Sequence, residues 1–187
     1  RIMAARRALI VLAEGAEEME VIITSDVLRR AGVEVTLAGL FGSSPITCAR
    51  KAVLTPDASF DDAIKTTHDV LILPGGMPGS KTLAETDKVG DALRSQFSSS
   101  HWIAAICAAP IALASHKISP GCTLTSYPGV RGKLEEAGYK YSEDKVVVDG
   151  KIVTSRGPGT AFEFALKLIE LLVGSDVSAK IRSDLLL

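Results

Sequence analysis

Short apolar runs alternate along the chain with stretches that have helical spacing. Four short runs, each bounded by polar or turn-forming residues, predict strands over residues 8–13, 33–40, 69–76 and 102–107. Apolar residues recur at three- and four-residue intervals in other stretches, which predicts helices over residues 17–32, 80–97, 108–115 and 161–174. Two β-rich runs flank Asp149 and Gly150 and predict a hairpin there.

The order of these elements indicates the fold class. Strands that are apolar throughout are buried on both faces, which is typical of a parallel sheet covered by helices. The alternation of strands with helices predicts the same α/β architecture, with a mostly parallel sheet and helices on both faces. Ligands bind beyond the carboxyl ends of the strands in such folds. Three segments with unusual chemistry are expected there: residues 15–20, 73–76 and 106–108.

Composition narrows the function classes. The 187 residues are 47% hydrophobic and 23% charged, with a net charge of −1, which fits a globular domain and gives no basic surface for nucleic acid. No apolar run is long enough to cross a membrane. The three cysteines are far apart, which excludes a paired-thiol or zinc motif and fits a reducing compartment.

The chain shows no repeat, low-complexity tract or linker, so we expect a single domain over residues 1–187. Residues 1–6 are basic and lack the apolar core of a signal peptide. They are expected to be disordered or to be a cloning remnant.

Cys107 ends a buried strand run and precedes two alanines and a proline. Small residues on both sides allow the sharp strand-to-helix turn that presents a nucleophile. A helix is predicted to begin at Ala108, and the partial positive charge of a helix N-terminus lowers the pKa of a thiol. The pattern fits an inert buried cysteine equally well. Cys48 and Cys122 have no comparable setting and are expected to be structural.

A glycine pair, Gly75 and Gly76, follows the strand run that ends at Leu73. Glycine permits a turn with positive φ, and a backbone N–H exposed there can stabilise the oxyanion of a reacting carbonyl. An ordinary strand-to-helix turn has the same sequence. The catalytic interpretation therefore depends on Cys107 lying nearby.

Three acidic residues, Glu17, Glu18 and Glu20, open the first predicted helix. Carboxylates are generally favoured at a helix N-terminus. Glu20 differs because it shares a mostly apolar stripe of the helix, where burial raises the pKa of a carboxyl. A protonated carboxyl beside a thiolate can donate a hydrogen bond to it, and the two groups then titrate as a coupled pair. Periodicity alone does not choose among the three glutamates.

The three histidines are poorly placed to act as a base for Cys107. His68 and His101 precede predicted strands and are expected at the opposite edge of the sheet, while His116 lies near the far end of the helix after Cys107. This disfavours a cysteine–histidine hydrolase.

Four segments together resemble a known family: LAEGAEEMEVI, LPGGMPGS, AAICAAPIAL and TSRGPGTAFEFAL. The chain resembles the DJ-1 family, whose parkinsonism-associated member is often described as a protein deglycase. This family belongs to a superfamily of intracellular-protease-like and amidotransferase-like proteins. The similarity runs from about Arg7 to the C-terminus.

The resemblance implies a flavodoxin-like sandwich that forms a homodimer. It selects Glu20 as the catalytic partner of Cys107 and makes Cys107 both the nucleophile and the oxidation site. It places the backbone N–H groups of Gly76 and Ala108 near the reacting oxygen. The residues that match substrate- or anion-binding positions are Gly75, Arg30, Arg50, Tyr127 and Pro158.

The activity implied by the resemblance is that of a glyoxalase or protein deglycase, of the hydrolase or lyase class, with a protective role in oxidative stress. It would convert methylglyoxal and glyoxal to 2-hydroxy acids and act on glycated protein adducts, with no metal and no organic cofactor. The alternative is a redox sensor or chaperone that acts through oxidation of Cys107 to sulfinic acid. The implied location is the cytoplasm, with the nucleus and the mitochondrion as further compartments.

Two positions depart from the family pattern. Met77, after the glycine pair, is apolar where some members carry a polar residue, and this is expected to change the shape of the pocket or the substrate preference. Tyr127 stands before Pro128 where many family members carry a histidine. This departure agrees with the lack of a histidine base for Cys107.

Overall fold

The computed structural model describes residues 4–187. Residues 1–3, for which disorder was expected, lie outside the described part of the chain. Arg6 belongs to the folded domain, contrary to expectation, because its Nε donates to the Leu172 carbonyl at 3.0 Å and its guanidinium pairs with Asp69 at 3.0 Å. No helix within residues 4–187 is long and apolar enough to cross a membrane.

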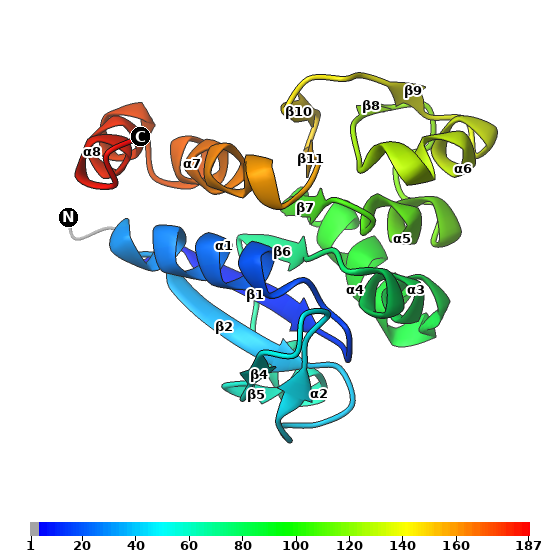
Figure 1. Cartoon of the computed structure of the whole chain (residues 1–187), viewed down its shortest axis with the longest axis horizontal. Helices are drawn as coiled ribbons and strands as arrows, with labels where there is room; N and C mark the ends of the chain where they lie inside the picture. Colours follow the sequence, from blue (N-terminus) through cyan, green and yellow to red (C-terminus); the bar gives the residue numbers. More distant parts are fainter. Residues whose placement is uncertain (1–3) are drawn as a thin grey trace.

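A seven-stranded sheet forms the centre of the molecule (Figure 1). Its strands are β1 (Arg7–Leu12), β2 (Glu34–Gly39), β5 (Ala58–Ser59), β6 (Val70–Leu73), β7 (Trp102–Ile106), β10 (Val146–Asp149) and β11 (Ile152–Ser155). Their order is β10-β11-β7-β6-β1-β2-β5, and all neighbours are parallel except β10 and β11. The series β2-β1-β6-β7-β11 has the flavodoxin-like order, so the predicted fold class is confirmed.

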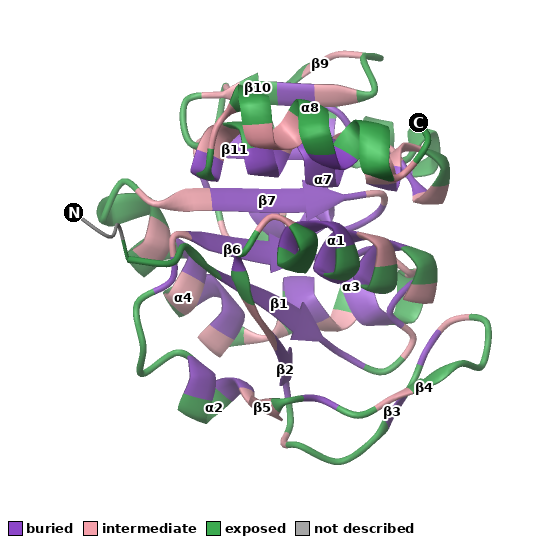
Figure 2. Cartoon of the chain, turned by 90° about the vertical axis from the view of Figure 1, so that its left-hand side faces the viewer, coloured by how far each residue is buried: buried purple, intermediate pink, exposed green. Residues whose placement is uncertain are grey.

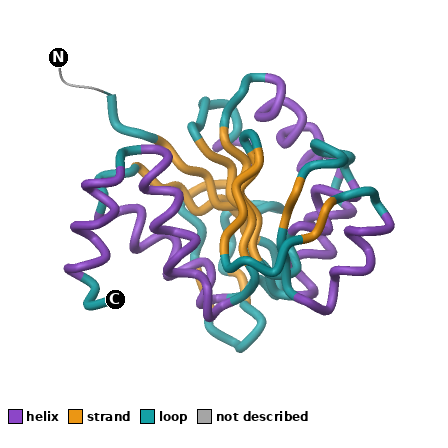
Figure 3. Tube along the Cα trace, turned by 90° about the horizontal axis from the view of Figure 1, so that it is seen from above, coloured by secondary structure: helices purple, strands orange, loops and turns teal. Residues whose placement is uncertain are grey.

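Helices cover both faces of this sheet (Figure 3). One face carries α1 (Glu18–Arg30), α7 (Ala161–Leu172) and α8 (Ser175–Asp184). The other side carries α2 (Phe60–Ala63), α3 (Met77–Glu85), α4 (Asp87–Ser98), α5 (Pro110–Ser115) and α6 (Arg131–Glu136). Two short strand pairs lie outside the sheet: β3 (Ile46–Thr47) with β4 (Val53–Leu54), and β8 (Thr123–Leu124) with β9 (Lys140–Tyr141). Two short 3₁₀ helices are η1 (Pro128–Val130) and η2 (Pro158–Thr160).

The core explains why the strand runs are apolar throughout. Successive side chains of a strand point to opposite faces, so Leu9 and Val11 of β1 pack under α2 to α6, while Ile10 and Leu12 pack under α1 and α7. Figure 2 shows β1, β6 and β7 as buried along most of their length. Both faces of β1 are therefore withdrawn from water from Ala8 to Leu12, and each of these positions carries an apolar residue.

The predicted single helix over residues 80–97 is wrong. Helix α3 begins at Met77 and ends at Glu85, and α4 begins at Asp87. Thr86 between them is extended, with φ −98° and ψ 113°, and its hydroxyl donates to the Thr82 carbonyl at 2.6 Å. The sequence carries neither glycine nor proline at this break, so it gives no local signal for it.

The predicted hairpin is confirmed, with its turn one residue later than expected. Asp149 pairs with Ile152, which leaves Gly150 and Lys151 as the turn residues. Gly150 has φ +57°, a conformation that favours glycine. The hairpin adds β10 as the antiparallel edge of the sheet.

Candidate active site

Cys107 stands at a strained turn directly after β7. Its φ is +65°, a left-handed conformation that is uncommon for any residue other than glycine. The Cys107 N–H donates to the Ser155 carbonyl at 3.0 Å, and the Cys107 carbonyl accepts from the Tyr127 N–H at 2.8 Å. These two contacts hold the turn from both sides, and the side chain is left half-buried at the carboxyl edge of the sheet. Strain of this kind is characteristic of functional sites.

Glu20 lies behind Cys107 and is 1% exposed. Its Oε2 accepts a 2.6 Å hydrogen bond from the Gly75 N–H. A Cβ at position 75 would stand 2.5 Å from the Cys107 Cβ and 2.5 Å from Glu20 Oε2. Gly75 therefore permits the carboxyl and the thiol to come together, and the structure selects Glu20 from the three candidate glutamates.

The other two glutamates position the surrounding backbone. The Glu17 N–H donates to the Gly75 carbonyl at 2.8 Å, which ties the start of α1 to the loop after β6. The Glu18 carboxylate accepts from the Arg50 N–H at 2.8 Å. This role of Glu18 was not predicted, because an acidic residue in a first helical turn carries no sign of a distant partner.

Gly76 provides one side of the anion-binding geometry. It has φ +91°, and a Cβ there would stand only 2.3 Å from the Gly15 carbonyl oxygen and 2.5 Å from the Glu17 nitrogen. The N–H groups of Gly76 and Ala108 both favour a negative charge on the Cys107 sulfur and lower its pKa. Two converging donors at a nucleophile can stabilise the oxyanion that forms when a carbonyl is attacked.

The ionisation of the pair differs from the expectation for Cys107. Burial raises the pKa of Glu20 to about 7, although hydrogen bonds from Gly75 and Cys107 lower it. Burial, and then the charge of Glu20, raises the pKa of Cys107 to about 12, against the hydrogen bonds of Ala108 and Gly76. The sequence predicted that the N-terminus of a helix would lower the pKa of Cys107. This effect is absent because α5 begins only at Pro110 and the nearest charge is a carboxylate.

The two groups share one proton at pH values above about 7. The first proton leaves the pair near pH 7, and the second leaves only at about 12 because Glu20 is already ionised. A thiolate exists in this pair when the remaining proton lies on Glu20. The N–H groups of Gly76 and Ala108 act against the burial that raises the pKa of the sulfur. In this form of the pair Glu20 is the acid and Cys107 the nucleophile, and no histidine is needed.

The raised pKa of Glu20 predicts a pH-dependent stability. Glu20 has a higher pKa in the folded protein than its ordinary value of 4.5, so stability present below pH 4.5 is lost as the pH rises towards 7. At pH 8, Glu20→Gln should therefore have a free energy of unfolding up to about 3 kcal/mol higher than that of the wild type. This difference should shrink as the pH is lowered towards 4.5. Urea unfolding of both proteins at several pH values measures this. A difference in the free energy of unfolding that does not change with pH would contradict the raised pKa of Glu20.

A cavity of about 630 Å³ opens in front of Cys107. Six predicted site residues line it: Arg50, Gly76, Cys107, Ala108, Tyr127 and Pro158. Glu17, Met77, Pro78 and Val130 line it as well. Glu17 was one of the three candidate glutamates, and Met77 was noted from its position after the glycine pair, whereas Pro78 and Val130 were not predicted at the site. Glu20 and Gly75 lie behind the thiol.

Arg30 is not brought to the cavity. It lies at the end of α1, where it pairs with Asp26 on the outer face of the helix. The expectation that Arg30 binds substrate is therefore not met within one chain. A contribution from Arg30 would need a second copy of the protein.

Arg50 reaches the cavity through the loop between β3 and β4. The Ala49 N–H donates to the Ala16 carbonyl at 2.8 Å, and the Arg50 N–H is held by Glu18. These contacts dock the loop on the segment that precedes α1. They place a cation at the rim of the cavity that contains Cys107.

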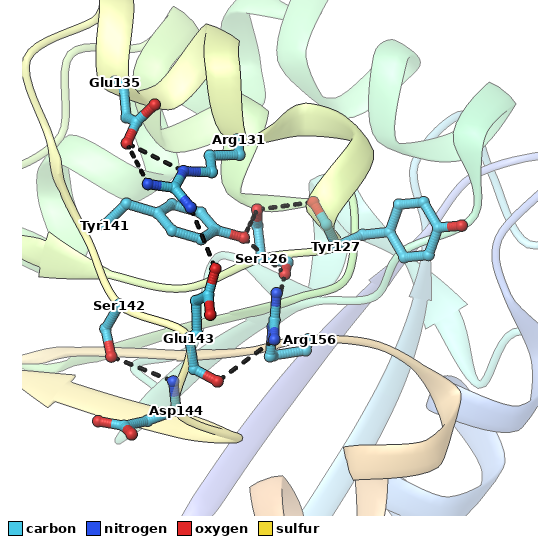
Figure 4. A network of polar contacts seen from close by, with 9 residues as sticks. All are labelled: Ser126, Tyr127, Arg131, Glu135, Tyr141, Ser142, Glu143, Asp144 and Arg156. Carbon is cyan, nitrogen blue, oxygen red and sulfur yellow. Dashed lines mark hydrogen bonds and ion pairs between the residues drawn. The ribbon is translucent and has the colours of Figure 1, made fainter.

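A polar network holds the segment that carries Tyr127 (Figure 4). The Ser126 carbonyl accepts from the Tyr141 hydroxyl at 3.0 Å and from Arg156 Nε at 3.3 Å. The Ser126 hydroxyl donates to the Tyr127 carbonyl at 2.9 Å. Arg131 lies over the Tyr141 ring, 4.8 Å from its centroid. Because the Tyr127 N–H also binds the Cys107 carbonyl, this network fixes the position of the nucleophile's backbone.

The histidines lie away from Cys107, as predicted. His68 and His101 line a separate cavity beside the amino ends of β6 and β7, and His116 Nε2 lies 2.9 Å from the Leu83 carbonyl. Within residues 4–187, no group of three or more histidine, cysteine or acidic side chains is arranged to hold a metal ion.

Comparisons with family models, curated proteins and solved structures all indicate the same family. The model of the DJ-1/PfpI family matches residues 6–171. A Danio rerio protein named Parkinson disease protein 7 homolog is 49% identical over 187 residues, covering 99% of each chain. A Caenorhabditis elegans protein named glutathione-independent glyoxalase DJR-1.2 is 44% identical over 93% of each chain. The crystal structure of Drosophila melanogaster DJ-1beta superposes with a TM-score of 0.96 at 49% identity, covering 98% of this chain and 99% of that one.

Proposed function

Because the chain belongs to the DJ-1/PfpI family, we propose that it is a cofactor-independent glyoxalase that converts methylglyoxal and glyoxal to 2-hydroxy acids. The observation that carries this proposal is the pairing of buried Glu20 with Cys107 at the base of an open cavity. The name of the Caenorhabditis elegans relative supports the same chemistry, without glutathione. Early dicarbonyl adducts on proteins are further proposed substrates, which would give the enzyme a deglycase activity and a protective role in oxidative stress.

The first step uses the thiolate of Cys107. It attacks the aldehyde carbon of methylglyoxal, and a C–S bond forms while the carbonyl π electrons move to oxygen. The N–H groups of Gly76 and Ala108 donate to that oxygen as its charge develops. Protonation of the oxygen gives a hemithioacetal.

The second step moves a proton between adjacent carbons. Glu20, as the carboxylate, removes the proton from the former aldehyde carbon and returns it to the neighbouring carbon through an enediol. The former aldehyde carbon is oxidised to a thioester, and the ketone carbon is reduced to an alcohol. Water then hydrolyses the thioester, releasing lactate and the thiol. The overall change adds one water to methylglyoxal and needs no external oxidant or reductant.

The proposal is tested by incubating the purified protein with methylglyoxal in the absence of glutathione and following lactate by NMR. Lactate formed in proportion to enzyme concentration is the expected result. Methylglyoxal loss without lactate, which simple adduct formation would produce, would contradict the glyoxalase assignment.

A second function, redox sensing, uses the same site. The Gly76 and Ala108 N–H groups and a protonated Glu20 surround the Cys107 sulfur with donors that would stabilise a sulfinate. Limited peroxide followed by peptide mass mapping is expected to oxidise Cys107, which lines the open cavity, before Cys48, which is buried, and before Cys122, which does not line the cavity. Equal oxidation of all three cysteines would count against a dedicated sensor, and a chaperone role that depends on that oxidation would fail with it.

We also propose that the protein acts as a homodimer in the cytoplasm, with the nucleus and the mitochondrion as further locations. Met19 and Ile22 are exposed apolar residues on the outer face of α1, the same helix that carries Arg30. A second copy docked on this face would cover both apolar side chains.

A further inference from the structure

The cavity is much larger than the smallest substrates of the proposed reaction. Its volume of about 630 Å³ lies in the range of pockets for drug-sized ligands, about 300 to 1,000 Å³. Methylglyoxal has only five non-hydrogen atoms. A small dicarbonyl attached to Cys107 would leave most of the cavity empty.

The substituent of a bound dicarbonyl can extend in one direction only. Glu20 and Gly75 close the space behind the thiol. The N–H groups of Gly76 and Ala108 face the position where the oxyanion would form. The open part of the cavity lies in front of Cys107, where a substituent on the ketone carbon would be placed.

This open part is mainly apolar. Tyr127 is 53% exposed and Met77 is 48% exposed, and both line the cavity, as do Pro78 and Val130. The charged groups at the cavity are Glu17 and Arg50, which carry opposite charges. The lining therefore favours an uncharged apolar substituent over an anionic or a cationic one.

The backbone of Tyr127 is held on both sides, and its ring lies close to Gly129. Its N–H donates to the Cys107 carbonyl, its carbonyl accepts from the Val130 N–H at 3.1 Å, and a Cβ at Gly129 would stand 3.2 Å from the Tyr127 ring. Figure 4 shows the ring pointing away from the polar network around Ser126. An exposed aromatic ring that lines the same cavity as the nucleophile can stack on a planar substituent.

We infer that Tyr127, supported by Met77, makes the site selective for α-oxoaldehydes whose ketone carries a bulky apolar or aromatic group. Phenylglyoxal represents this class: its aldehyde reacts with Cys107, its phenyl ring lies against Tyr127, and addition of one water gives mandelate by the steps described above. The inference rests on the proposed glyoxalase function.

The test compares initial rates for phenylglyoxal and methylglyoxal in the wild type, Tyr127→Phe and Tyr127→Ser. Each protein's kcat/KM for phenylglyoxal is divided by its own value for methylglyoxal. This ratio should fall about fivefold to tenfold in Tyr127→Ser, which loses the ring, and stay within about twofold of the wild type in Tyr127→Phe, which keeps it. Equal ratios in all three proteins would overturn the inference.

A readout that needs no turnover separates this inference from the proposed function. If the wild type consumes neither substrate, the glyoxalase proposal is wrong, and the aromatic contact is tested by the alkylation of Cys107 with N-phenylmaleimide and N-methylmaleimide. The phenyl-to-methyl rate ratio should again fall in Tyr127→Ser and not in Tyr127→Phe. A ratio that does not depend on residue 127 would show that Tyr127 does not contact the substituent.

Discussion

Cys107→Ser is expected to lower kcat/KM for methylglyoxal by at least about a thousandfold. Serine fits the same turn, which is held by Ser155 and Tyr127 through backbone atoms alone. Its hydroxyl remains protonated at neutral pH, however, so no anion is available to attack the aldehyde. Lactate formation at matched enzyme concentrations measures the effect.

Cys122→Ser serves as the control for this substitution. Cys122 is half-buried and follows Gly121 in another part of the fold, away from the residues that line the cavity. It should retain the wild-type rate. A Cys107→Ser protein with more than about a tenth of the wild-type rate would show that the thiolate is not the nucleophile.

Glu20→Gln is expected to lower kcat by about 10²- to 10⁴-fold, the range contributed by a general acid or base. The glutamine amide oxygen can still accept from the Gly75 N–H, so the site should keep its shape. The amide cannot remove the proton from the hemithioacetal carbon. Alkylation of Cys107 by iodoacetamide should persist in this variant, which separates loss of the base from loss of the thiol.

The same variant should change the pH profile. In the wild type, kcat/KM is expected to fall below about pH 7, because the doubly protonated pair contains neither a thiolate nor a base. Removing Glu20 should replace the limb near pH 7 with one set by the Cys107 thiol, whose pKa is raised by burial. A Glu20→Gln protein with full turnover and the wild-type profile would exclude Glu20 as the proton carrier.

The sequence predicts the sheet well because burial on both faces leaves a clear local signal. Strands β1, β6 and β7 fall in continuous apolar runs, and their order along the chain predicts the α/β class. The break at Thr86 could not be predicted, since it depends on how α3 and α4 pack rather than on a helix-breaking residue.

The site could be predicted only in part. Small residues beside Cys107 and the Gly75-Gly76 pair mark both turns, but the choice of Glu20 from three glutamates requires the contact with Gly75. The pKa of Cys107 is raised by burial and then by the charge of Glu20, which is distant in sequence, so a rule based on helix N-termini gave the wrong direction. Arg30 pairs with Asp26 and does not line the cavity of its own chain, so a contribution to the site requires a second copy of the protein.

The most direct test of the proposed chemistry is the detection of a covalent intermediate on Cys107 during turnover. The protein is mixed with methylglyoxal, quenched with acid within the first turnovers, and mapped by peptide mass. The hemithioacetal, enediol and thioester are isomers, so each adds the mass of one methylglyoxal to the peptide that contains Cys107. We predict that this adduct forms at Cys107, decays as the substrate is exhausted, and accounts for the lactate released. Lactate production with no adduct on Cys107 would contradict nucleophilic catalysis by this residue.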